Sequence, residues 1–173
     1  LLKDIESPEP LKINMLHYHS SSLVTIKDLS VRYPDSDTPL FSGLSMEIRS
    51  GSRIALSGKN GCGKSSLIRL ILGENIPHTG EISAASGLRI SYVSQDTSHL
   101  HGTLSEFALH RGVDASLLLT VLDKLGLERP QFEKRIETYS EGQKKKVLLA
   151  NSLCEPAHLF VWDYPLNYID IFS

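Results

Sequence analysis

The alternation of hydrophobic and polar residues predicts strands along much of the chain. The segments "LVTIKDL" at 23–29 and "LSMEI" at 44–48 alternate as half-buried strands do. A short apolar run, "RIALS" at 53–57, suits a buried strand, as do "LRISYVSQ" at 88–95 and "HLFVWD" at 158–163. Near-continuous apolar runs are typical of a parallel sheet that helices cover on both faces.

Helical periodicity occurs between these strand candidates. In "KSSLIRLILG" at 64–73, three apolar residues share one helical face, and Gly73 provides a stop signal. Three further helices are predicted at "TLSEFALH", "DASLLLTVLDKLGL" and "EGQKKKVLLANSL". The order of elements therefore predicts an α/β fold with a helical insert before the last strand.

Length and composition restrict the possible classes of protein. The chain has 173 residues, which suits one domain with an attached arm. Its formal net charge of -2 gives no global indication of a nucleic-acid partner. The two cysteines, Cys62 and Cys154, lack metal-ligand spacing and favour a reducing, cytoplasmic compartment. No apolar run reaches the roughly 20 residues that cross a bilayer.

The ends of the chain suggest its domain organisation. Residues 1–20 contain two prolines and no sustained period, so we interpret them as a linker or arm, with the domain at 21–173. The chain begins at Leu1 and stops at Ser173, soon after a strong motif. We therefore expect it to be a piece of a longer protein.

A glycine-rich motif follows the run at 53–57. The residues "GKNGCGKSS" at 58–66 fit the pattern G-x-x-x-x-G-K-[ST] between a predicted strand and a predicted helix. The glycines permit positive φ and close approach of the backbone, so that N–H groups face a polyphosphate. Lys64 would place its ammonium on the β and γ oxygens, and the Ser65 hydroxyl would take one Mg²⁺ position. The motif predicts a nucleoside triphosphate with Mg²⁺ as ligand.

Further features have the spacing of one family of phosphate-loop proteins. Tyr33 lies 25 residues before Gly58, Gln95 ends the strand "ISYVSQ", and "YSEGQKKKV" starts at Tyr139. Asp163 ends the strand "HLFVWD", and "NYID" follows it. In these motifs the chain resembles the ABC ATPases, with "YSEGQ" similar to the family signature LSGGQ. The resemblance implies a P-loop fold with an added antiparallel β part and a helical subdomain at about 96–152.

The resemblance also implies roles for individual residues. Tyr33 would stack on adenine, and a tyrosine that merely lies at a strand edge is the alternative. Cys62 suits either a small loop position or redox sensing. The signature would face the nucleotide of a second ATPase domain in a head-to-tail pair. The implied nucleotide-binding residues are Tyr33, Gly58, Lys59, Asn60, Gly61, Cys62, Gly63, Lys64, Ser65 and Ser66. The implied Mg²⁺ ligands are Ser65, Gln95 and Asp163, and the catalytic positions are Gln95 and Tyr164. The implied signature comprises Ser140, Glu141, Gly142 and Gln143, and the D-loop ends at Asp170.

Longer phrases narrow the resemblance. "PLKIN", "SGLRISYVSQDTS" and the segment from "QKKKVLLANSL" to "NYID" are similar to the second ATPase domain of ABC-F proteins that protect ribosomes against antibiotics. The expected function is ATP binding and hydrolysis, with the ribosome and a second ATPase domain as partners. The nucleotide-binding subunit of a membrane transporter and a nonfunctional remnant remain alternatives. Lysines 144–146 would form either a solvated face or a contact with ribosomal RNA.

Two departures from the family pattern concern hydrolysis. Tyr164 occupies the position of the glutamate that orients the attacking water, and a neutral phenol is a poor acceptor for its proton. None of the seven histidines follows Asp163, so the family's switch histidine and later strands are missing. We expect retained nucleotide affinity with impaired hydrolysis. A degenerate gene copy, a sequence error, a site kept for binding, and an aromatic that packs under the nucleotide are all compatible with Tyr164.

Overall fold

The computed structural model describes residues 11, 13–33 and 36–163. The described chain divides into two compact units, which are treated separately. The α/β unit comprises Met15–Ser91 and Ala157–Asp163, apart from residues 34 and 35, and the helical unit comprises Tyr92–Pro156 with the described residues 11, 13 and 14. The elements are β1 (Ser22–Val31), β2 (Phe41–Arg49), α1 (Lys64–Ile71), β3 (His78–Ala84), β4 (Ile90–Val93), α2 (Leu104–Arg111), α3 (Ala115–Lys124), η1 (Arg129–Gln131), η2 (Ile136–Thr138), α4 (Glu141–Cys154) and β5 (Leu159–Trp162).

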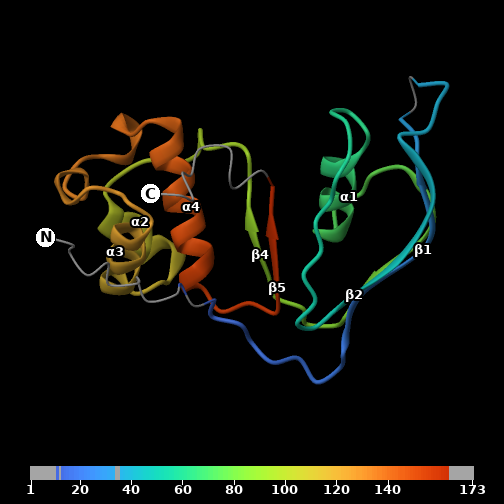
Figure 1. Cartoon of the computed structure of the whole chain (residues 1–173), viewed down its shortest axis with the longest axis horizontal. Helices are drawn as coiled ribbons and strands as arrows, with labels where there is room; N and C mark the ends of the chain where they lie inside the picture. Colours follow the sequence, from blue (N-terminus) through green and yellow to red (C-terminus); the bar gives the residue numbers. More distant parts are fainter. Residues whose placement is uncertain (1–10, 12, 34–35, 164–173) are drawn as a thin grey trace, which may run out of the picture. The chain divides into compact units, whose positions relative to one another are not determined.

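The α/β unit contains an antiparallel sheet in the order β2-β1-β3 (Figure 1). The predicted strands at 23–29 and 44–48 are confirmed as parts of β1 and β2. Five apolar side chains of β1 are buried and form a core with the apolar face of α1. The core includes Leu23, Val24, Ile26, Leu29, Val31, Leu67, Leu70 and Ile71. This packing fixes α1, and with it the end of the glycine-rich loop.

A second sheet consists of β4 and β5, whose arrows run in the same direction in Figure 1. Both strands were predicted from their apolar runs, and Leu159 and Ile90 pack against the core of the α/β unit. The buried residue Asp163 directly follows β5. The phenol of Tyr18, within the predicted arm, is also buried and donates a hydrogen bond to the Ser86 carbonyl at 2.5 Å.

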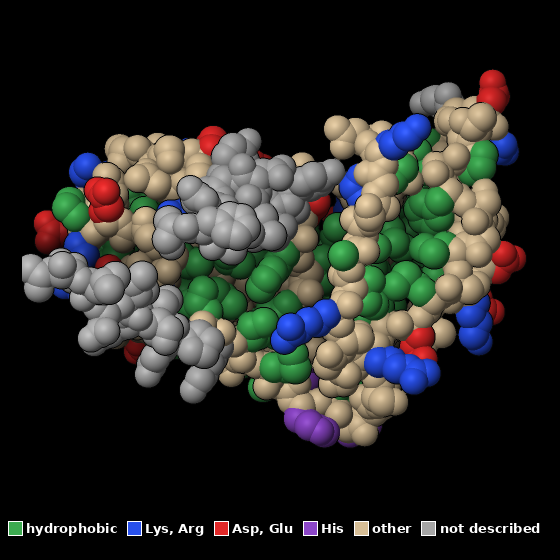
Figure 2. Space-filling view, in the orientation of Figure 1, with side chains coloured by type: hydrophobic (Ala, Val, Ile, Leu, Met, Phe, Trp, Pro, Cys, Tyr) green, Lys and Arg blue, Asp and Glu red, His purple; other side chains and the backbone are tan. Residues whose placement is uncertain are grey.

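One predicted strand does not form. Residues 53–57 are not part of any described strand, and Ile54 and Leu56 are 47% and 38% exposed. A strand requires a hydrogen-bonded neighbour, and the described strands pair among themselves without this segment. Figure 2 shows hydrophobic side chains at the surface of the α/β unit.

The helical unit is built from α2, α3 and α4, which confirm the three predicted helices. Each helix has a side chain that caps its N-terminus: Thr103 for α2, Asp114 for α3 and Ser140 for α4. Such caps satisfy N–H groups that the helix itself leaves without partners. The core of the unit contains Leu104, Phe107, Leu118, Leu122, Leu127, Ile136 and Val147. No helix of the described residues is long and apolar enough to cross a membrane.

Candidate functional site

The glycine-rich loop leads into α1 through two residues in the left-handed region. Gly61 has φ 79° and Gly63 has φ 95°, values that glycine adopts without strain. A Cβ on Gly63 would lie 2.7 Å from Cδ1 of Phe41, whereas a Cβ on Gly61 would meet no atom within 4 Å. The loop is therefore packed against β2 at Gly63 and open at Gly61.

The N-terminus of α1, unlike those of the other described α-helices, has no side-chain cap. Its N-cap residue is Gly63, which makes no side-chain cap, and its first turn contains no acidic residue. The first N–H groups of a helix lack intrahelical partners and carry the positive end of the helix dipole. This end of α1 is therefore suited to an anion such as phosphate.

Lys64 curls back over the loop. Its ammonium donates hydrogen bonds to the carbonyls of Gly58 at 2.8 Å and Lys59 at 3.0 Å, and lies 4.0 Å from Sγ of Cys62. The loop itself is closed by a hydrogen bond from the Cys62 N–H to the Lys59 carbonyl at 3.3 Å. The structure thus holds a positive charge at the loop that is predicted to bind phosphate.

Tyr33 lies beside α1. Its hydroxyl and that of Ser66 form a hydrogen bond of 3.2 Å, and 38% of Tyr33 is exposed. Because Tyr33 follows β1, the sheet brings this predicted adenine-stacking residue to the helix that begins at the phosphate loop. Ser65, the predicted Mg²⁺ ligand, is exposed in the first turn of α1.

The α/β unit holds the predicted nucleotide-binding residues from Tyr33 to Ser66 together with Asp163. Gln95 and the signature lie in the helical unit, and Tyr164 and Asp170 lie outside the described residues. The described residues contain no group of three or more His, Cys, Asp or Glu side chains that could hold a metal ion.

The signature forms the start of α4. The Ser140 hydroxyl accepts a hydrogen bond from the Gln143 N–H at 3.3 Å, and Oε1 of Gln143 accepts one from the Ser140 N–H at 2.9 Å. This capping box uses the acceptor side of the serine, and its O–H remains a donor. Tyr139 is buried, and its hydroxyl donates to the Gln131 carbonyl at 2.6 Å. Burial raises the pKa of Tyr139, so its phenol stays neutral.

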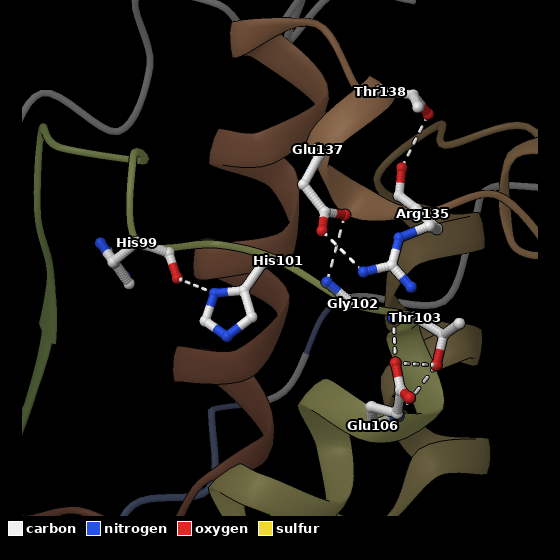
Figure 3. A network of polar contacts seen from close by, with 8 residues as sticks. All are labelled: His99, His101, Gly102, Thr103, Glu106, Arg135, Glu137 and Thr138. Atoms are coloured by element: carbon white, nitrogen blue, oxygen red, sulfur yellow. Dashed lines mark hydrogen bonds and ion pairs between the residues drawn. The ribbon is translucent and has the colours of Figure 1, made fainter.

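A polar network fixes the segment before the signature (Figure 3). The Gly102 N–H donates to Oε2 of Glu137 at 3.1 Å, and Arg135 donates to Oε1 at 2.8 Å. The Glu137 N–H, the Arg135 guanidinium and the Gly102 N–H lower the pKa of Glu137 to about 2. Beside them, Glu106 and Thr103 form the capping box of α2.

The segment after β4 contacts α4 through side chains that the sequence motifs did not identify. The Thr97 hydroxyl donates to Oε2 of Glu141 at 2.6 Å, and the ammonium of Lys145 donates to the carbonyls of Ser94 and Gln95. Glu141 and Lys145 are four residues apart, so they share one face of the helix. That spacing was the available sequence signal, but nothing in the sequence showed which segment this face meets.

The three lysines after the signature do not form one solvated face. Lys145 is 5% exposed, and Lys144 pairs with Glu141 at 3.3 Å. The ammonium of Lys146 donates to the Gly126 carbonyl at 3.0 Å. The interpretation of all three as a solvated face is therefore wrong, because the helix buries the central one.

Comparison with known proteins identifies similar sequences. The family profile described as "ABC transporter" matches residues 41–167. "ATP-binding protein Uup" of Buchnera aphidicola is 29% identical over 98% of this chain, which spans 30% of that protein. "Zinc import ATP-binding protein ZnuC" of Photorhabdus laumondii is 31% identical over 87% of this chain, which spans 59% of that protein.

A solved structure is similar in fold. An inward-facing metal-chelate type ABC transporter matches with a TM-score of 0.64 and 24% identity, covering 88% of this chain and 63% of the other. This chain thus spans less than two thirds of the length of these relatives.

Proposed function

This chain belongs to the ABC transporter family of ATPase domains, and from that premise we propose that it is an ABC-F type domain that binds ATP with Mg²⁺ and hydrolyses it slowly. The observation that carries the proposal is the loop from Gly58 to Ser66, which ends at an uncapped helix N-terminus and has the Lys64 ammonium folded over it.

The residues of the α/β unit are suited to the nucleotide. The backbone of the loop and the end of α1 would hold the phosphates, Lys64 would neutralise the terminal ones, and Tyr33 would pack on the base. Mg²⁺ would be held by Ser65, Asp163 and Gln95, and would neutralise charge on the phosphates.

Slow hydrolysis follows from Tyr164. The family uses a glutamate there as the acceptor for the proton of the attacking water, and a phenol of ordinary pKa near 10 does not accept it at neutral pH. Loss of a general base typically costs about 10²- to 10⁴-fold in rate. Single-turnover hydrolysis of ATP should therefore accelerate in Tyr164→Glu, while Tyr164→Phe should behave like the natural chain. Equal rates in all three proteins would refute this part of the proposal.

The ABC-F assignment is supported by the similarity to proteins named "ATP-binding protein Uup". The relative from Buchnera aphidicola matches over 98% of this chain, and the relative from Caulobacter vibrioides matches over 87% with 30% identity. The phrases that resemble ABC-F proteins support the same assignment, with the ribosome and a second ATPase domain as partners.

A transporter subunit is the second candidate. It is favoured by the 34% identity to the zinc import protein of Yersinia enterocolitica. ATP-dependent co-sedimentation of the full chain with purified ribosomes, compared with membranes that contain transporter subunits, distinguishes the two. The ABC-F proposal expects ribosome binding that increases with ATP. Binding to the membranes alone would favour the transporter, and binding to neither would contradict both partner assignments.

A further inference from the structure

A buried lysine joins the signature helix to the segment that carries Gln95. Lys145 lies in the second turn of α4 and is 5% exposed. Its ammonium donates to the Ser94 carbonyl at 2.9 Å and also to the Gln95 carbonyl. Both acceptors are main-chain oxygens of the turn that follows β4. The lysine therefore restrains the backbone of Gln95, which positions its side chain.

The burial of this charge indicates a specific interaction. A buried ammonium is costly unless hydrogen bonds and opposite charges compensate it. Two carbonyls supply hydrogen bonds, and the carboxylates of Asp96 and Glu141 lie close enough to interact electrostatically with Lys145. Removal of the ammonium would leave the two carbonyls without this donor and the carboxylates without this positive charge.

A second side-chain bond joins the same two segments. The Thr97 hydroxyl donates to Glu141 at 2.6 Å, and Glu141 occupies the first glycine position of the family signature. Hydrogen bonds from Thr97 and Lys144 lower the pKa of Glu141, so it is anionic at neutral pH. The departure from glycine at 141 therefore adds a link that a glycine has no side chain to make.

The neighbouring lysines show that this link is particular to Lys145. Lys144 pairs with Glu141 on its own helix, and Lys146 donates to the Gly126 carbonyl in the turn after α3. Lys146 thus makes the same kind of bond, from ammonium to main-chain carbonyl, to a segment remote in sequence from Gln95. It offers a matched control.

We propose that Lys145 is a positioning residue that, together with the Glu141–Thr97 bond, fixes the main chain at Gln95 to the signature helix. The proposal rests on the proposed nucleotide-binding function, because the role of Gln95 at Mg²⁺ belongs to that function. With this link, a displacement of α4 when a second ATPase domain engages Ser140 is transmitted to the backbone of Gln95. The signature and the Mg²⁺ ligand then respond as one body.

The first test compares ATP affinity with Mg²⁺ and in EDTA. It uses the full chain and the variants Lys145→Met, Lys145→Arg, Lys146→Met, Gln95→Ala and Gln95→Ala/Lys145→Met. Mg²⁺ raises the affinity for ATP above its value in EDTA, and this ratio is the quantity compared. Because hydrogen bonds to charged groups contribute on the order of a tenfold effect or more, the ratio should be roughly tenfold smaller in Lys145→Met than in the natural chain. The affinity of this variant in EDTA should not change, and Lys145→Arg should retain most of the gain.

The control and the double variant separate positioning from general stability. Lys146→Met should bind ATP like the natural chain, and the double variant should match Gln95→Ala alone, since Lys145 acts through Gln95. Losses that add in the double variant, or an unchanged Mg²⁺ gain in Lys145→Met, would overturn the proposal. Absence of ATP binding by the natural chain would overturn the proposed function instead.

A measurement without nucleotide tests the link between Lys145 and the main chain at Gln95, whether or not the chain binds ATP. Hydrogen exchange should become about tenfold faster over residues 94–99 in Lys145→Met, and over the turn at 125–128 in Lys146→Met. Equal exchange over 94–99 in the natural chain and in Lys145→Met would show that the lysine does not hold this segment.

Discussion

Alanine at the two left-handed glycines of the phosphate loop should separate stability from binding. Gly61 and Gly63 have φ 79° and 95°, so each alanine is strained by about 1–2 kcal/mol. At Gly63 the new Cβ would also meet Phe41 at 2.7 Å and 3.0 Å and Cβ of Leu40 at 3.2 Å. Overpacking of this kind costs about 1–3 kcal/mol, so Gly63→Ala should lose about 2–5 kcal/mol in all.

The assay is urea unfolding followed by circular dichroism, with ATP titration of the same samples. Gly61→Ala should lose only the conformational term in stability, because nothing lies within 4 Å of its Cβ. Its ATP affinity should fall clearly, since the open space at Gly61 is where the proposed function places phosphate. The reasoning is refuted if Gly63→Ala is no less stable than Gly61→Ala, or if Gly61→Ala binds ATP as well as the natural chain.

Two further predictions concern Tyr33 and Glu137. Tyr33→Phe removes only the hydroxyl bonded to Ser66 and should keep ATP affinity within about threefold, whereas Tyr33→Ala should weaken it by about ten- to a hundredfold, as loss of base stacking does; equal affinities, measured by titration, would remove the stacking role. The lowered pKa of Glu137, about 2 against an ordinary 4.5, means that its stabilising contribution is complete above about pH 4.5 and is lost as the pH falls toward 2. Glu137→Gln should therefore flatten the pH dependence of urea unfolding in that window, and an unchanged slope would contradict the assignment.

Local signals in the sequence predicted most elements and the α/β class, and the resemblance of the ordered motifs to ABC ATPases implied the ABC-type P-loop fold that the comparisons support. The glycine pattern before α1 specifies a loop and a helix start within nine residues, 58–66. The start of α4 can be predicted in the same way, because Ser140 and Gln143 have the spacing of a capping box.

Features that depend on distant partners were not predictable. The strand β3 was missed because most of its residues are exposed and it contains a single large apolar residue, Ile82, which is partly buried. Its formation depends on pairing with β1. The segment 53–57 has a strand-like pattern, but in the described chain no strand pairs with it. Burial of Lys145 depends on the carbonyls of Ser94 and Gln95, some fifty residues away.

The most direct test of the proposed nucleotide site is calorimetric titration of ATP with Mg²⁺ into the folded full chain and two lysine variants. The exposed Lys27, on β1 in the same unit, serves as the control for Lys64. The natural chain and Lys27→Ala should bind one ATP with equal affinity, and Lys64→Ala should bind at least about tenfold more weakly because charged hydrogen bonds to phosphate are lost. A folded natural chain that takes up no ATP, or a Lys64→Ala variant that binds as well as Lys27→Ala, would contradict the proposed site.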